Sequence, residues 1–161
     1  MFREMRRKNQ TLSRAACEEI LRQATAGVLA VAGDDGYPYA VPLSFAYEDG
    51  RILFHGALTG HKLDAIARED KVSFCVIDGD QVVPEEFTTY FRSVIAFGRA
   101  RVLSSEPEKR RALKILADKY SPGLAEARDR VIAEQAARTA VVEIVVEYLS
   151  GKEAIELVRM R

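Results

Sequence analysis

The sequence predicts a mainly β fold in which six antiparallel strands form a closed or split barrel with helices outside it. Three observations predict this class. Six runs are rich in β-branched and aromatic residues, tight turns join several successive runs, and only three or four segments show apolar residues at helical spacing. The expected strands cover residues 27–32, 39–47, 52–54, 71–77, 90–103 and 139–148.

Composition argues against several classes of partner. Acidic and basic residues balance at 24 each, so the chain has no overall field that would attract nucleic acid or an acidic membrane surface. No apolar run approaches the roughly 18 residues of a membrane span, and no apolar segment follows the basic residues at the start. We therefore expect one cytoplasmic domain, residues 1–161, in which Cys17 and Cys75 are reduced core thiols.

The first expected helix follows a basic arm, residues 1–10, which we expect to be mobile or covered by a partner. Thr11 or Ser13 can cap this helix, because their hydroxyls accept from the free N–H groups of a first turn. Gly27 is expected to stop it.

A hairpin should follow, since the turn-forming residues 33–36 separate the strands 27–32 and 39–47. Pro42 lies inside the second of these strands and cannot donate to a ladder. It therefore marks an edge strand or a local break in pairing, and it leaves neighbouring backbone groups free for a ligand.

Residues 52–67 contain both histidines of the chain. The apolar strand 52–54 ends at His55, and glycines bracket the short loop that follows, where they permit positive φ angles or close approach of a ligand. Apolar residues then recur at helical spacing. A helix is therefore expected to begin near Thr59 or Gly60, with His61 and Lys62 in its first turn.

Basic residues are unfavourable at the positive end of a helix unless an anion is present. Free N–H groups, Lys62 and a glycine together predict a phosphate site. The stretch is not a P-loop, because Leu63 stands where the metal-binding hydroxyl belongs and the spacing is one residue short. The phosphate should belong to a ligand that needs no metal, such as a flavin mononucleotide or pyridoxal phosphate. Alternatively, Lys62 is a solvated surface lysine and His61 a polar helix residue.

The second half of the chain begins with a polar excursion, residues 78–89, which is too charged to be core and is expected to fold over a site or form an interface. The longest strand, 90–103, starts with Arg92 and Ser93. If both are buried they need partners, and an anion would satisfy both. Two helices, 106–120 and 124–138, precede the last strand, and a tail at 150–153 follows it.

Four motifs, in this order along the chain, carry a resemblance to a known family. They are Val41–Phe45, Phe54–Ala57 with Gly60–Lys62, Tyr90–Ile95 with Phe97–Ala100, and Ser150–Glu153. The chain resembles the FMN-binding split-barrel proteins related to pyridoxamine 5'-phosphate oxidase, and within them the 5-nitroimidazole-resistance (Nim) reductase branch. The resemblance covers nearly the whole chain and implies a six-stranded antiparallel split β-barrel.

The resemblance also implies FMN as cofactor, a homodimer with FMN at the subunit interface, and a role for each matching residue. The phosphate would lie near His61, Lys62 and Arg92, while Ser93 and Val94 would touch the phosphate or the ring. Main-chain groups of Pro42, Leu43, Ser44 and Phe45 would face the isoalloxazine. His55 would lie close to the ring and position the substrate or donate a proton, a task that suits imidazole near neutral pH.

Two departures from the family pattern weaken the link to nitroimidazoles. Leu149 stands where Nim-like tails often have tryptophan, and Lys62 stands where some relatives have arginine, which loses a bidentate grip on phosphate. The expected function is a flavin-dependent reduction of a small electrophile such as a nitro compound, with NAD(P)H as the reductant. The alternatives are a non-catalytic flavin- or haem-binding protein of the same fold and a pyridoxamine phosphate oxidase-like enzyme; for His55 itself, the alternative is a structural strand-end histidine. No metal site is expected, because the two histidines lack a third ligand at zinc-like spacing.

Overall fold

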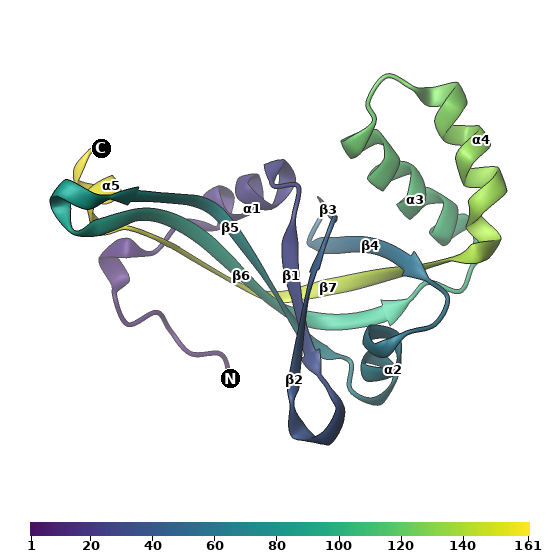
Figure 1. Cartoon of the computed structure of the whole chain (residues 1–161), viewed down its shortest axis with the longest axis horizontal. Coiled ribbons are helices and arrows are strands. Elements are labelled where there is room, and N and C mark those ends of the chain that lie inside the picture. Colours follow the sequence, from purple (N-terminus) through teal and green to yellow (C-terminus); the bar gives the residue numbers. More distant parts are fainter.

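The computed structural model describes residues 1–161 and contains seven strands and five α-helices (Figure 1). The strands are β1 Gly27–Ala32, β2 Pro38–Leu43, β3 Ala46–Glu48, β4 Arg51–Ala57, β5 Lys71–Val83, β6 Thr88–Val102 and β7 Thr139–Glu153. The helices are α1 Arg14–Gln23, α2 His61–Arg68, α3 Glu106–Tyr120, α4 Ala125–Gln135 and α5 Ile155–Arg159. Short 3-10 turns lie at Lys8–Gln10, Asp34–Gly36, Pro84–Glu86 and Ala136–Arg138.

All seven strands form one antiparallel sheet in the order β2-β1-β5-β6-β7-β4-β3, so the expectation of six strands is wrong by one. The run 39–47 is divided between β2 and β3, which lie at opposite edges of the sheet. Only Ser44 and Phe45 connect these edges, so the sheet must curl until its edges approach one another. The sheet does not close by hydrogen bonds, and an apolar run alone could not show where the chain crosses from one edge to the other. The expected edge position of Pro42 is confirmed, since β2 is an outer strand.

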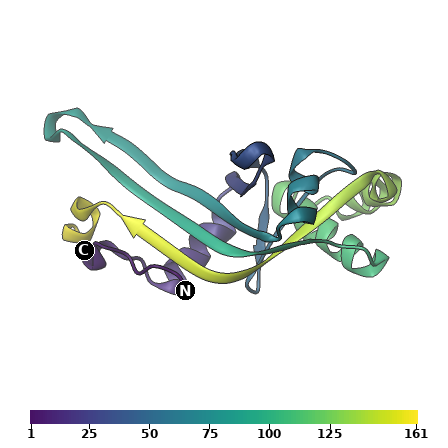
Figure 2. The same ribbon diagram turned by 90° about the horizontal axis from the view of Figure 1, so that it is seen from below.

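The expected polar excursion at 78–89 is mostly strand. β5 continues to Val83, a turn follows in which Phe87 takes a positive φ of 52°, and β6 starts at Thr88. This long hairpin projects from the body of the molecule (Figure 2). Its outer half is polar because it covers no core within the chain, yet ladder hydrogen bonds still satisfy the backbone. The tail at 150–153 is likewise the end of β7.

Most helix boundaries agree with the capping residues. Ser13 accepts from Ala16 N–H at the start of α1, and Ser105 accepts from Glu108 N–H at the start of α3. α1 ends at Gln23, before Gly27, which instead opens β1. The last long helix ends at Gln135 and passes into a 3-10 turn.

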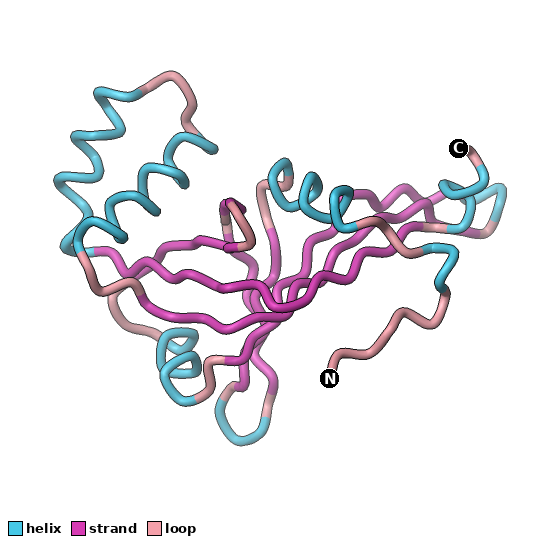
Figure 3. Tube along the Cα trace, turned by 180° about the vertical axis from the view of Figure 1, so that it is seen from behind, coloured by secondary structure: helices cyan, strands magenta, loops and turns pink.

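Two apolar clusters form the core. The larger fills the curl of the sheet beneath α1, and the rings of Phe45 and Phe74 meet edge to face in it with centroids 4.8 Å apart. The smaller packs the hairpin of α3 and α4 onto β4 and β7, with Leu53 and Val141 on the sheet side. Helices therefore lie at both ends of the strands, the α3–α4 hairpin at one end and α5 at the other (Figures 1 and 3).

The basic arm lies on the sheet. The Phe2 ring stacks on Tyr148 at a centroid distance of 4.9 Å and packs at 5.4 Å from Phe97. Cys17 and Cys75 are both free thiols, and burial raises the pKa of each. None of the helices combines the length and the apolar character needed to cross a lipid bilayer.

Candidate functional site

The residues that the sequence singled out lie in three places rather than one. Ser44 and His55 lie together at a cavity beside the α3–α4 hairpin. His61 and Lys62 lie at the start of α2, and the remaining group lies at the distant end of β6. That group comprises Arg92, Ser93 and Val94.

The cavity at His55 has a volume of about 470 Å³ and is mainly apolar. The α3–α4 hairpin forms most of its wall, and the ends of β4 and β7 and the link between β2 and β3 supply the rest. Its lining residues are Ser44, His55, Leu113, Leu116, Ala117, Tyr120, Val131, Ile132, Gln135 and Thr139. His55 reaches the cavity because it alternates with Phe54, whose side chain faces the larger core. The cavity therefore has the size and lining of a small-molecule site.

The link between β2 and β3 is fixed by two residues of α3 that the sequence reasoning did not single out as functional. Phe45 is fully buried, and its N–H donates to Tyr120 Oη at 2.8 Å. Its carbonyl accepts from Tyr120 Oη and from Lys119 Nζ, both at 2.9 Å. The main-chain groups of Phe45, expected to face a flavin ring, are thus engaged within the chain. The only sequence signal was a tyrosine in the apolar stripe of α3, whose hydroxyl needs a partner when it packs inward.

Lys119 is a partly buried cation with no carboxylate partner. Its ammonium donates to the carbonyls of Ala24 and Phe45 and lies 4.2 Å from the centre of the Phe45 ring. Burial lowers the pKa of Lys119 from its ordinary value. The ammonium group therefore lies in the seam, by which we mean the contact between the end of α1 at Ala24 and the β2–β3 link at Phe45.

The start of α2 has the character of an anion site. Gly60 offers no capping side chain, and the first main-chain bond runs from Asp64 N–H to Gly60 O, so the N–H groups of residues 61–63 have no partner within the helix. Lys62 Nζ would lie 3.4 Å from a Cβ added to Gly56, so the ammonium rests against the main chain of β4. The His61 ring stacks on Tyr39 with centroids 4.0 Å apart, and its Nε2 is 3.8 Å from Asp34 Oδ2. These groups fit a flavin phosphate.

His55 and Lys62 approach β4 from opposite faces, because Gly56 points away from the face that carries His55. A single ligand that contacts both must therefore pass around the end of the strand.

Arg92, Ser93 and Val94 are far from both groups. Arg92 pairs across the sheet with Glu153 on β7, whereas His55 pairs with Val141 on the same strand. At ~3.3 Å per residue this separation is about 40 Å along β7. Arg92 also has partners already, since it lies 3.6 Å from Asp78 and 3.7 Å from Glu153.

Arg92 Nε is buried and makes no hydrogen bond, because its ion-pair partner Glu153 Oε2 is 3.7 Å away, beyond hydrogen-bond distance. Val94 is fully buried in the larger core, so its side chain is not available to a ligand.

One face of the sheet carries an uncharged row that crosses five strands in register. Pro42 pairs with Val28, Val28 with Cys75, Cys75 with Ile95, and Ile95 with Ser150. Val28 and Ile95 keep more than a third of their surface exposed, and the N-terminal arm lies beside Ile95 and Ser150. No helix covers this row in a single copy of the chain, apart from what the arm shields.

The fold and the site together define a class: a curled antiparallel sheet with a mainly apolar cavity and an uncapped helix start at one end of its strands. The family model for pyridoxamine 5'-phosphate oxidase matches residues 13–153. The chain belongs to this family, and the resemblance drawn from its motifs is confirmed at that level. No curated protein matches the sequence at a significant level.

Solved structures share the fold. An FAD-binding protein from Mesorhizobium loti is 28% identical, with 90% of this chain and 97% of that chain covered and a TM-score of 0.66. A flavocytochrome from Azotobacter vinelandii is 25% identical, with 94% and 72% covered and a TM-score of 0.78. A candidate 5-nitroimidazole antibiotic resistance protein from Bacteroides thetaiotaomicron is 23% identical, with 89% and 86% covered and a TM-score of 0.74. At that identity the last comparison shows the fold alone.

Proposed function

We propose that this chain is a flavin-dependent oxidoreductase that binds FMN and reduces a small electrophile, such as a nitro compound, with NAD(P)H. The observation that carries the proposal is the placement of His55. It lines a cavity of small-molecule size, and its strand leads within a few residues to an uncapped helix start with a lysine beside it. Membership of the family and similarity to an FAD-binding protein support a flavin as the cofactor.

The start of α2 would hold the phosphate of FMN. Unpartnered N–H groups and Lys62 offer hydrogen bonds and positive charge where a phosphate needs them. The chemistry that a bound flavin supplies is hydride transfer from the nicotinamide to the acceptor. His55 would orient the acceptor and give the proton that accompanies the hydride, since it carries the only imidazole in the cavity wall.

A homodimer would bring the separated residues together. Arg92 and Ser93 lie about 40 Å along the strand from His55, so they can join the same flavin site only if they come from a second copy. The uncharged row from Pro42 to Ser150 is a surface on which a second copy could pack in a two-fold arrangement. A ligand or partner group at Arg92 would also supply the hydrogen bond that its Nε, 3.7 Å from Glu153, does not make.

The test is titration of the purified protein with FMN and, in parallel, with FAD, read by visible absorption, followed by size measurement. We expect a bound flavin spectrum and a dimer. Lys62→Ala should weaken FMN binding at least about tenfold, because a phosphate loses its nearest cation. Glu69→Ala, near the other end of α2, is the matched control and should bind normally. A protein that stays colourless at saturating flavin would refute the proposal.

A second candidate is a flavin- or haem-binding protein without turnover, which similarity to a flavocytochrome favours. Steady-state oxidation of NADH or NADPH with a nitroaromatic acceptor separates the two. An oxidoreductase shows a rate that depends on the acceptor, whereas a pure binder does not. A haem-binding protein would instead show an intense Soret band on addition of haem.

A further inference from the structure

We propose that the cavity at His55 admits an uncharged and largely apolar molecule and rejects phosphorylated or otherwise anionic ones. The inference names the substrate class of the oxidoreductase proposed above and therefore rests on that function. It also separates this chain from the phosphate-ester chemistry in its family's name.

The lining of the cavity carries the inference. No lysine, arginine, aspartate or glutamate is among the ten residues of its wall, and six of them are hydrophobic. A phosphate dianion that entered this space would give up part of its hydration without gaining a cation from the wall, which disfavours it relative to an uncharged molecule. An uncharged ring system has no such penalty and gains from the removal of apolar surface from water.

Several cations near the cavity are engaged away from it. Lys119 is committed to the carbonyls of Ala24 and Phe45. The arginines on the other side of α3 are paired with glutamates around a different cavity. Lys62 lies on the face of β4 opposite to His55. Within the wall itself, His55 is the only basic side chain.

A few polar groups remain free to orient an uncharged ligand. Thr139 Oγ1 donates to the Gln135 carbonyl, and Tyr120 Oη is engaged by Phe45 and Thr25. The His55 imidazole and the Ser44 hydroxyl, by contrast, form none of the side-chain hydrogen bonds of this region and are solvent-exposed. Both can donate to an acceptor such as a nitro or ketone oxygen. The cavity therefore fits an uncharged, largely apolar molecule that bears a hydrogen-bond acceptor.

The test uses prodan, an uncharged naphthalene ketone whose fluorescence shifts to shorter wavelength in an apolar site. We expect the full-length protein to bind prodan and naphthol to displace it. Naphthyl phosphate should compete at least about 100-fold more weakly, because of the cost of burying its charge. This assay does not require a flavin or turnover.

Two substitutions in the wall, with one control outside it, test whether prodan binds in this cavity. Ala117 lies on the wall, so Ala117→Phe should fill the cavity and weaken prodan binding at least about tenfold. Ala133→Phe adds the same bulk to an exposed position of α4 outside the wall and is the matched control. Val131 lies on the wall but is 56% exposed, so Val131→Arg should fold normally and increase competition by naphthyl phosphate at least about tenfold.

Each outcome of these experiments either supports or overturns the inferred selectivity of the cavity. Absence of a prodan signal, equal binding by Ala117→Phe and wild type, or equal competition by naphthol and naphthyl phosphate would overturn the inference. If flavin binding fails while prodan binding depends on Ala117, the proposed function falls but the selectivity of the cavity stands. If flavin-dependent turnover occurs equally with neutral and phosphorylated nitroaromatics, the proposed function stands and this inference falls.

Discussion

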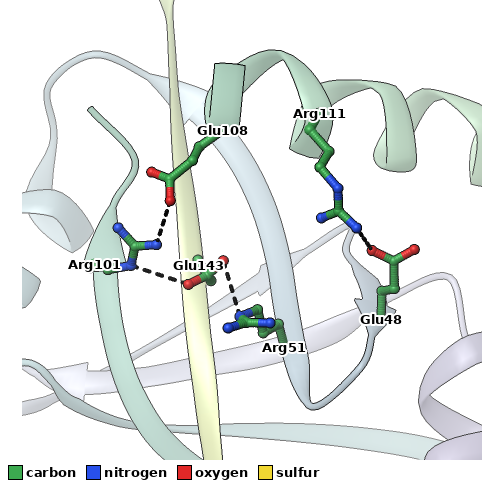
Figure 4. Close-up of polar contacts among 6 residues, drawn as sticks. All are labelled: Glu48, Arg51, Arg101, Glu108, Arg111 and Glu143. Carbon is green, nitrogen blue, oxygen red and sulfur yellow. Dashed lines mark hydrogen bonds and ion pairs between the residues drawn. The ribbon is translucent and has the colours of Figure 1, made fainter. Parts of the chain in front are cut away.

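Two cavities flank α3, and they differ in almost every respect. The first has a volume of about 250 Å³ and is lined by charged side chains that pair with one another (Figure 4). Its members include Glu48, Arg51, Arg101, Glu108, Arg111 and Glu143. The second is the cavity at His55, which is nearly twice as large and contains no charged pair.

The pairing within the first cavity makes it a poor site for an anion. Glu143 is 8% exposed, and its carboxylate lies 3.1 Å from Arg101 and 3.4 Å from Arg51. Arg101 also reaches Glu108 at 3.1 Å (Figure 4). An incoming anion would have to displace a carboxylate that is already in place. At the second cavity, the His55 imidazole and the Ser44 hydroxyl have no comparable competitor, so their hydrogen-bonding capacity is free for a ligand.

The largest expected effect is on catalysis at the uncharged cavity. His55→Ala should slow acceptor-dependent NAD(P)H oxidation about 100-fold or more, because a positioned proton donor contributes on that scale. Flavin affinity should be retained. Steady-state kinetics and a flavin titration of the same preparation provide the measurements. Equal rates for the variant and the wild type would make His55 a structural strand-end residue.

Breaking the charged cavity should affect stability instead. Glu143→Gln leaves Arg51 and Arg101 without their shared counter-charge and should lower the free energy of unfolding by about 1–3 kcal/mol. The estimate is below that for a fully buried pair, because both arginines are half exposed. Urea denaturation measures the change. Glu48→Gln, which breaks an exposed pair with Arg111, is the control and should cost less than about 1 kcal/mol.

A smaller effect is expected at the seam beside the second cavity. Tyr120→Phe removes the hydroxyl that accepts from Phe45 N–H and donates to a carbonyl, at a cost of about 1–2 kcal/mol. Hydrogen exchange should report it directly, since the buried Phe45 amide loses its acceptor. An unchanged exchange rate at Phe45 would mean that the seam does not depend on this hydroxyl.

The smallest expected effect is on the pH dependence of stability. A hydrogen bond from Arg101, followed by the charge of Arg101, lowers the pKa of Glu108 below its ordinary value of 4.5. The stability gained from this pair is therefore fully present above about pH 4.5 and is lost as pH falls through the lowered pKa. Acid titration of the unfolding midpoint, with Glu108→Gln as the variant, should show a shallower acid decline in the variant. Identical acid curves would contradict the pairing.

The comparison also shows what a sequence can predict. Local chemistry named Ser13 as one of two candidate caps and an edge strand as one of two interpretations of Pro42, and the structure agrees with both. The wall of the cavity at His55 could not be predicted in this way. Most of it comes from α3 and α4, which follow His55 by some sixty residues or more along the chain. The Phe45 contacts depend in the same way on residues of α3. No local pattern encodes such pairings.

Arg92 shows the same limit of sequence-based prediction in a different way. Its need for a partner was evident from the sequence, but the sequence could not tell whether an anion or a carboxylate would supply it. In the fold, Asp78 and Glu153 are its neighbours because β5 and β7 flank β6. Strand order is a property of the whole chain, and it decides which charges meet.

The two-residue bridge at Ser44 and Phe45 has a consequence for folding. Its bonds to Tyr120 join positions 75 residues apart, whereas the β5–β6 and β1–β2 hairpins require only short loops. Long loops are costly to close, so the bridge should dock after those hairpins have formed and be among the first parts to open. Because Ser44 and Tyr120 also line the cavity, each such opening would momentarily remove part of its wall. Transient opening of the Ser44–Phe45 bridge would thus set how quickly a ligand enters and leaves the cavity at His55.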